Sequence, residues 1–135
     1  MILDFQNIAE VKRQVKSGLN SASSIPEWKK EIFSFLEWYY SLEGPLIQKT
    51  SGSTGIPKEI KLSREVLSAS AEATSAYFKL AKRSSALLCI PAKFIGGKMM
   101  LVRAIMSGWE LTCVEPNGNL SSVLEGLSSF DFTAM

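Results

Sequence analysis

The residues best suited to chemistry lie between Thr50 and Lys58, in the stretch TSGSTGIPK. Its two glycines, Gly52 and Gly55, let backbone N–H groups converge on an anion because no side chain stands in the way. Lys58 adds a point charge suited to phosphate. Further donors are the hydroxyl groups of Thr50, Ser51, Ser53 and Thr54. The stretch predicts a loop that binds a polyphosphate, although the same composition also fits a Ser/Gly-rich surface hairpin without a ligand.

The two common nucleotide-binding glycine motifs do not fit this stretch. In the pattern G-x-x-x-x-G-K-[ST], counting from Gly52 puts Pro57 where the second glycine belongs. The pattern G-x-G-x-x-G fails as well. A phosphate site here must therefore be of another kind.

The elements that would hold the loop follow from the apolar pattern on either side of it. Residues 45–50 and 59–63 are typical of strands, and a helix capped by Ser63 is expected to run to about Lys82. The apolar run 85–91 indicates a strand buried on both faces of a parallel sheet. A helix over 97–107, a strand over 109–115, a helix over 121–129 and a further strand from 131 complete an α/β pattern.

The residues before the loop predict two helices. Phe5, Ile8, Val15 and Leu19 give the first an apolar face, with its end near Gly18. Ser24 and Glu27 form the pattern of a capping box for the second, and Gly44 is placed to end it. We therefore divide the chain into an N-terminal helical segment, 1–44, and an α/β segment, 45–135.

Composition narrows the function further. The chain has 135 residues, 46% of them hydrophobic, which suits one domain with a real core. A net charge of +2 is too small to indicate that the protein binds nucleic acid. Histidine is absent, so the chain contains no Ser-His or Cys-His pair and lacks the commonest zinc ligand. Cys89 and Cys113 lie in apolar runs and are expected to be buried reduced thiols. With no signal peptide or membrane span in the pattern, we expect a cytoplasmic protein.

The stretch TSGSTGIPK resembles the signature phosphate loop of the adenylate-forming superfamily, [ST]-[SG]-G-[ST]-[ST]-G-x-P-K, and meets every defined position. A second stretch, CIPAKFIGGKMMLVRAIMSGWEL, is similar to the family segment in which a strand ends in proline and a Gly-containing helix follows. The resemblance spans Leu46 to about Val114. It implies that the chain is the first part of the large N-terminal domain of such an enzyme.

The resemblance also implies an activity. The loop would close over the β- and γ-phosphates of ATP, with Mg²⁺, while a carboxylate attacks the α-phosphorus, and CoA would then displace AMP. The family's adenine-binding segment, ribose-binding aspartate and lid lysine would all lie beyond Met135. We therefore expect no catalytic residue and no metal ligand within the chain, and no ligase activity from these 135 residues alone.

The substrate is indicated by Phe94, Gly96, Gly97 and Arg103. Many family members have P-x-x-H-x-G-G where this chain reads PAKFIGG, so Phe94 replaces a histidine of the acyl pocket with an aromatic wall. Arg103 either reaches solvent from a helix edge or meets an anion. Its placement resembles the o-succinylbenzoate–CoA ligases of menaquinone synthesis, whose aromatic substrate has a second carboxylate.

Two alternatives stay open. One is an acyl- or aryl-CoA ligase of other specificity, whose substrate has no second carboxylate. The other is a non-catalytic α/β module that binds an anion or a partner protein through the same loop. Recognition of ATP or pyrophosphate would separate the enzyme from a partner-binding module.

Overall fold

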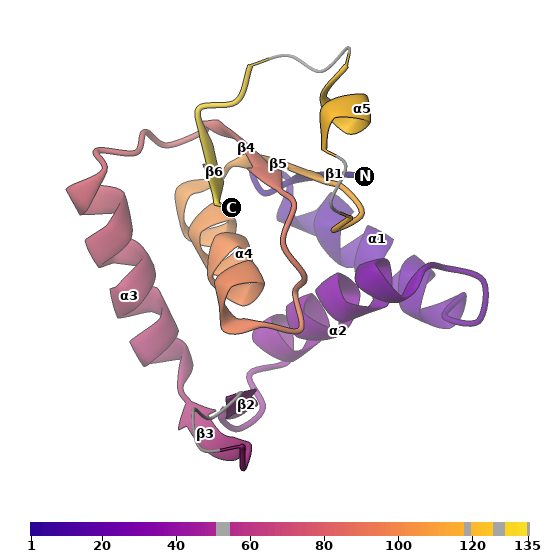
Figure 1. Ribbon diagram of the computed structural model, residues 1–135, viewed down its shortest axis with the longest axis vertical. Helices are drawn as coiled ribbons and strands as arrows, with labels where there is room; N and C mark the ends of the chain where they lie inside the picture. The colour runs from indigo at the N-terminus through magenta and orange to yellow at the C-terminus, as the bar shows by residue number, and fades with distance from the viewer. Residues whose placement is uncertain (51–54, 118–119, 126–128, 135) are drawn as a thin grey trace.

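We describe the fold from a computed structural model, in which residues 1–50, 55–117, 120–125 and 129–134 are described. A four-stranded sheet with the order β1-β5-β4-β6 forms one end of the molecule (Figure 1). Its central strands, β4 (Ser85–Leu88) and β5 (Glu110–Cys113), are parallel, with Ser85 opposite Glu110. Strand β6 (Phe132–Ala134) adds to β4 in parallel. The mixed α/β architecture predicted from the sequence is confirmed.

The N-terminus contributes a strand that the sequence pattern did not reveal. Strand β1 (Ile2–Asp4) pairs antiparallel with β5, with Leu3 opposite Leu111. The terminal ammonium of Met1 donates to the carbonyl of Cys113 at 2.9 Å. Three residues are too few to show an alternating pattern, so the sequence predicts no separate strand before the first helix.

Helix α1 (Ile8–Asn20) begins later and ends later than expected. Asn7 caps it by accepting from the N–H of Glu10. Gly18 lies inside the helix instead of ending it. A Cβ at Gly18 would lie 2.2 Å from the ring of Phe33, so this glycine lets α1 approach the next helix closely.

Helix α2 (Glu27–Ser41) has neither of the predicted ends. Pro26 is its N-cap and no side chain caps it, so the predicted capping box of Ser24 and Glu27 is wrong. The Ser24 hydroxyl instead donates to the carbonyl of Ser21. At the other end Leu42, not Gly44, adopts the left-handed conformation, with φ 58°.

Helix α3 (Arg64–Tyr77) begins as predicted, because the Ser63 hydroxyl accepts from the N–H of Val66 at 3.2 Å. It ends five residues before the expected Lys82. The following segment turns back through Lys79 and Arg83, both at positive φ. The indole of the fully buried Trp109 donates to the carbonyl of Ala81 at 3.0 Å, which fixes this turn against the sheet.

Helix α4 (Ile95–Ser107) packs beside α3 and carries many of the core side chains (Figure 1). It ends at Gly108, which is left-handed with φ 64°. A short helix, α5 (Ser121–Leu124), follows β5; the rest of the predicted 121–129 helix either lies outside the described residues or is not helical. Cys89 and Cys113 are free and buried, as predicted. None of the helices described is both long and apolar enough to cross a membrane.

The remaining two strands form a hairpin of their own. Strands β2 (Leu46–Thr50) and β3 (Lys58–Leu62) pair antiparallel and lie apart from the four-stranded sheet, near the ends of α2 and α3 (Figure 1). Leu62 lies opposite Leu46 at the root of the hairpin, and Thr50 lies opposite Lys58 where the loop begins.

Candidate functional site

The hairpin brings the two ends of the TSGSTGIPK stretch together. The Thr50 hydroxyl donates to the carbonyl of Lys58 at 3.2 Å, across the last pair of the ladder. The predicted donors Ser51, Gly52, Ser53 and Thr54 lie outside the described residues. The structure therefore defines the two residues between which the loop is held, Thr50 and Lys58.

Gly55 and Lys58 are the described residues of the loop's second half. Gly55 has φ +78°, a conformation that L side chains rarely adopt, and open space surrounds the position where a Cβ would stand. The side chain of Lys58 is exposed. Both features suit a loop whose backbone and ammonium group face a soluble anion, and their role in phosphate binding stays a prediction.

Beside this hairpin lies a mainly apolar cavity of about 420 Å³. Phe94, whose side chain is 55% exposed, lines it together with residues of both strands and of the loop between them. The lining residues are Gln48, Lys49, Thr50, Pro57, Ile60, Phe94 and Ile95. The structure thus brings Phe94, predicted to wall an acyl pocket, next to the first residue of the predicted phosphate loop.

The sequence alone did not single out Gln48, Ile60 and Ile95. All three are ordinary residues within a predicted strand or next to a predicted helix. Only the pairing of β2 with β3 places Gln48 and Ile60 opposite one another, and this register follows from the loop length. The alternation of Gln48 and Thr50 on one face of β2 could have indicated Gln48. No local signal indicates Ile60 or Ile95.

Gly96 and Gly97 differ in their surroundings. A Cβ at Gly97 would lie 2.4 Å from the carbonyl oxygen of Pro91 and 2.8 Å from the Cα of Ala92. A Cβ at Gly96 would meet only the tip of the Ile90 side chain, at 3.2 Å. Gly97 is therefore required for the first turn of α4 to pack against the preceding loop. Their predicted contact with substrate stays a prediction.

Arg103 lies on α4 and faces α3. Its Nη2 donates to the hydroxyl of Thr74 at 3.2 Å. Its Nε is buried and has no hydrogen-bond partner in the described structure. Burial lowers the pKa of the guanidinium. No carboxylate among the described residues lies within ion-pair distance of Arg103, and Arg103 does not line the cavity at Phe94.

The described residues supply no evident metal centre. No group of three or more Cys, Asp or Glu side chains among them is arranged to hold an ion. Next to the loop, the described part of the hairpin carries Lys49 and Lys58 but one carboxylate, Glu59, whose oxygen lies 3.9 Å from the Lys49 ammonium. This charge balance fits a phosphate group better than it fits a bare cation.

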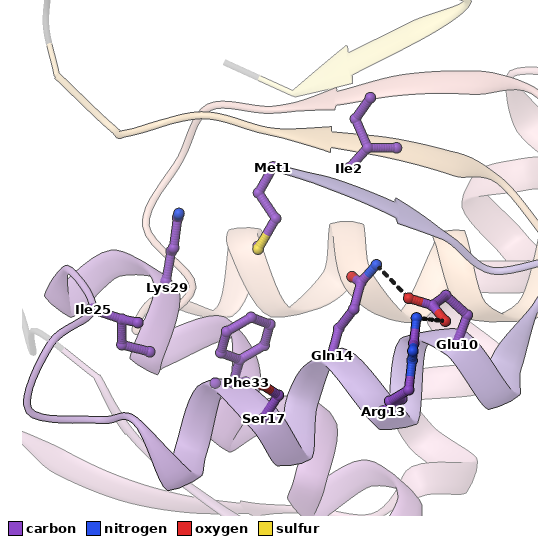
Figure 2. A pocket seen from close by; sticks show the side chains of 10 residues that line it. Met1, Ile2, Glu10, Arg13, Gln14, Ser17, Ile25, Lys29 and Phe33 are labelled. Atoms are coloured by element: carbon purple, nitrogen blue, oxygen red, sulfur yellow. Dashed lines mark hydrogen bonds and ion pairs between the residues drawn. The ribbon is translucent and has the colours of Figure 1, made fainter.

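A larger cavity, of about 630 Å³, lies between β1, α1 and α2 (Figure 2). Met1, Ile25 and Phe33 give it apolar walls. Arg13 faces Glu10 and is paired with it at 2.6 Å, and this contact is the main reason for the lowered pKa of the Glu10 carboxyl. None of the predicted site residues lines this cavity. Of its charged side chains, Arg13 and Glu10 are paired with one another, and Lys29 lies over the ring of Trp28.

Comparison with known proteins bears on the fold of most of the chain. No protein-family profile matches the chain, and no curated protein matches it. Among solved structures, the crystal structure of an acyl-CoA synthetase (AMP-forming)/AMP-acid ligase II-like protein from Dyadobacter fermentans is similar, with a TM-score of 0.67 and 38% sequence identity. The match covers 79% of this chain and 30% of that chain.

This similarity gives the fold its class. The described α/β arrangement is that of a segment of an adenylate-forming enzyme. An identity of 38% over most of the chain also supports the resemblance to the adenylate-forming superfamily noted in the sequence. The chain spans less than a third of the length of that protein.

Proposed function

We propose that the chain is the ATP-phosphate-binding segment of an AMP-forming acid–thiol ligase. The observation that carries this proposal is the shared cavity of Thr50 and Phe94, which joins the predicted phosphate loop to the predicted acyl pocket. A ligase of this kind must bring the α-phosphorus of ATP to the carboxylate of its substrate. A site in which those two binding regions are adjacent supports that chemistry.

The proposed reaction has two steps, adenylation of the carboxylate and then thioester formation. A carboxylate oxygen forms a bond to the α-phosphorus while the bond to the β-phosphate oxygen breaks, which gives an acyl-adenylate and pyrophosphate. The CoA thiol then gives up its proton to solvent, its sulfur forms a bond to the acyl carbon, and AMP leaves with the electrons of the broken bond between the acyl carbon and the phosphate oxygen. Backbone N–H groups near Gly55 and the ammonium of Lys58 would stabilise the charge that grows on the departing pyrophosphate.

Mg²⁺ would neutralise part of the phosphate charge during the first step. Mg²⁺ is commonly held by substrate phosphates with one or two carboxylates, so the proposal requires no cluster of acidic side chains among the described residues. The ribose-binding and lid groups that the resemblance implies would come from further segments of the enzyme. We therefore propose that the 135-residue chain is inactive as a ligase by itself and acts within a longer, cytoplasmic enzyme.

For the substrate we propose o-succinylbenzoate, which would make the enzyme the CoA ligase of menaquinone synthesis. Two features support this choice. The aromatic ring of Phe94 offers a face for an aromatic acid. The half-buried guanidinium of Arg103, with Nε lacking a partner in the described structure, suits a second carboxylate. Arg103 lies outside the cavity at Phe94, so this contact requires the substrate to extend beyond that cavity towards α3 and α4.

The test is ATP–pyrophosphate exchange by the full-length protein, measured with o-succinylbenzoate, benzoate and a medium-chain fatty acid. Exchange that depends on o-succinylbenzoate is expected, and CoA should then convert the adenylate to a thioester with release of AMP. Exchange with benzoate or the fatty acid alone would keep the enzyme class and reject the substrate. If the protein binds neither ATP nor pyrophosphate, the hairpin does not have the phosphate-binding role proposed for it.

A further inference from the structure

Within the described residues, the hydrogen bonds from the hairpin to the rest of the protein run through the side chain of Gln48. Of the side chains in the described strands β2 and β3, Gln48 is buried, with 8% of its surface exposed. Its neighbours along both strands are exposed or half-buried. A buried amide needs hydrogen-bond partners, since burial without them is costly.

Lys98, in the first turn of α4, supplies the main partner. Its ammonium donates to the Gln48 amide oxygen at 2.7 Å and to the carbonyl of Lys93 at 2.7 Å. The Gln48 amide nitrogen donates to the same Lys93 carbonyl, at 3.3 Å, and to the carbonyl of Lys49, at 3.0 Å. These bonds tie together the hairpin, the loop that leads to Phe94, and α4.

The same contact extends to α2. The Glu31 carboxylate accepts from the N–H of Lys93 at 3.2 Å, so the loop before Phe94 is held from both sides. The position of Lys98 is otherwise unfavourable: a cation in the first turn of a helix meets the positive end of the helix dipole. Burial also lowers the pKa of the Lys98 ammonium, and the charge of Glu31 opposes that shift.

We infer that Lys98 is a positioning residue, which acts through Gln48 to hold the phosphate-loop hairpin at a fixed distance from the loop that bears Phe94. This inference rests on the function proposed above. Thr50 lies two residues beyond Gln48 on the same face of β2, and Phe94 directly follows the carbonyl that Lys98 and Gln48 share. The contact therefore sets the alignment of the ATP phosphates with the carboxylate to be activated.

The first arm of the test measures the position of the hairpin without any substrate. Spin labels at Ile56→Cys and Glu37→Cys, both exposed positions, report the distance between the hairpin and α2; the native cysteines are buried. Lys98→Met should broaden the distance distribution. Lys61→Met is the matched control, because it removes an exposed charge of the hairpin itself and should leave the distribution unchanged.

The second arm measures adenylation by the full-length enzyme. Lys98→Met should lower kcat about tenfold and raise the KM for ATP, because a small misplacement of bound groups costs up to about a hundredfold in rate. Gln48→Met removes the same contact from the hairpin side and should reproduce both changes even if Lys98→Met folds poorly. The double variant should lose no more than either single variant.

Two results would overturn the inference. One is an unchanged distance distribution in both variants. The other is a broadened distribution in an enzyme that keeps the kinetic constants of the wild type. A wild-type protein that shows no adenylation with any carboxylate would count against the proposed function, and the distance distribution would then decide by itself whether Lys98 holds the hairpin.

Discussion

The guanidinium of Arg64 lies 4.2 Å above the ring of Trp38 and donates hydrogen bonds to the backbone at the end of α2. Its Nε donates to the carbonyl of Tyr39 at 3.0 Å, and its other nitrogens donate to the carbonyls of Trp38, Glu43 and Gly44. Arg64 is the first residue of α3, directly after the hairpin. A single side chain therefore caps one helix from the start of another.

The first prediction follows from this cap. Arg64→Ala should lower the free energy of unfolding by about 3 kcal/mol, since one hydrogen bond to a charged group contributes about 1.5–3 kcal/mol. Arg64→Lys should recover part of the loss, because an ammonium cannot reproduce the planar fork. Denaturant unfolding measures both. Arg13→Ala, which removes an exposed ion pair, is the control and should leave the free energy of unfolding nearly unchanged.

The same residue explains why the end of α2 could not be predicted. Local rules favour a glycine at the left-handed position, and Gly44 was the nearest candidate. Leu42 takes that position because Arg64, more than twenty residues later in the chain, satisfies the free carbonyls. Contacts between distant segments are not visible in a local pattern. The short strand β1 and the early end of α3, fixed by Trp109, were missed for the same reason.

What the sequence did predict depends on short-range physics. The Ser63 cap, the buried strand β4 and the main helices follow from capping, hydrophobic periodicity and strand-length apolar runs. The phosphate site that the loop motif indicates stays a prediction. The cavity shared by Thr50 and Phe94 depends on how the hairpin docks, so it could not be derived from the motif.

The second prediction concerns the loop in the full-length enzyme. Lys58→Ala removes the charge that we expect to face phosphate, and Gly55→Val puts a branched side chain at φ +78°. Loss of one preorganised donor should slow adenylation about a hundredfold, or about 3 kcal/mol in the barrier. ATP–pyrophosphate exchange measures this effect. Lys61→Ala on the same hairpin is the control, and wild-type rates in both loop variants would show that the loop does not bind phosphate.

The third prediction separates two adjacent glycines. Gly97→Ala should lower the free energy of unfolding by about 1–3 kcal/mol, because its Cβ would collide with the backbone of Pro91 and Ala92. Gly96→Ala should be close to neutral or slightly stabilising, since the Ile90 tip can move and alanine favours the helix. Thermal unfolding of the pair measures the difference. Equal stabilities would mean that the loop containing Pro91 and Ala92 moves to accommodate the Cβ without a loss in the free energy of unfolding.

The fourth prediction concerns alkaline pH. Complete burial raises the pKa of the Cys113 thiol to about 12, whereas an unfolded thiol has a pKa of about 8.5. The unfolded state therefore loses its proton first, so the stability from the neutral thiol is complete below about pH 8.5 and is lost as the pH rises towards 12.

Within that range the free energy of unfolding should fall by up to about 1.4 kcal/mol for each pH unit from this group. Denaturant titrations at pH 8, 9 and 10 measure the slope (~1.4 kcal/mol per unit at the upper end). Cys113→Ala should be less stable at neutral pH but should show a smaller slope. Equal slopes in the two proteins would show that the thiol does not control the alkaline loss.

The last prediction tests the substrate through Arg103. If its guanidinium binds the second carboxylate of o-succinylbenzoate, Arg103→Ala should lower kcat/KM for that substrate. The loss should be equivalent to about 2–5 kcal/mol, because the carboxylate loses its partner in a partly apolar site. The KM for ATP should change little, and Arg103→Lys should recover only part of the loss.

A purely structural arginine predicts a different result. Its contact with Thr74 joins α3 to α4, so the variant would have a lower melting temperature and an unchanged affinity for substrate. Thr74→Ala is the matched control, since it removes that contact and keeps the charge. Michaelis constants and melting temperatures for the three variants distinguish the two roles, and normal use of o-succinylbenzoate by Arg103→Ala would reject the carboxylate contact.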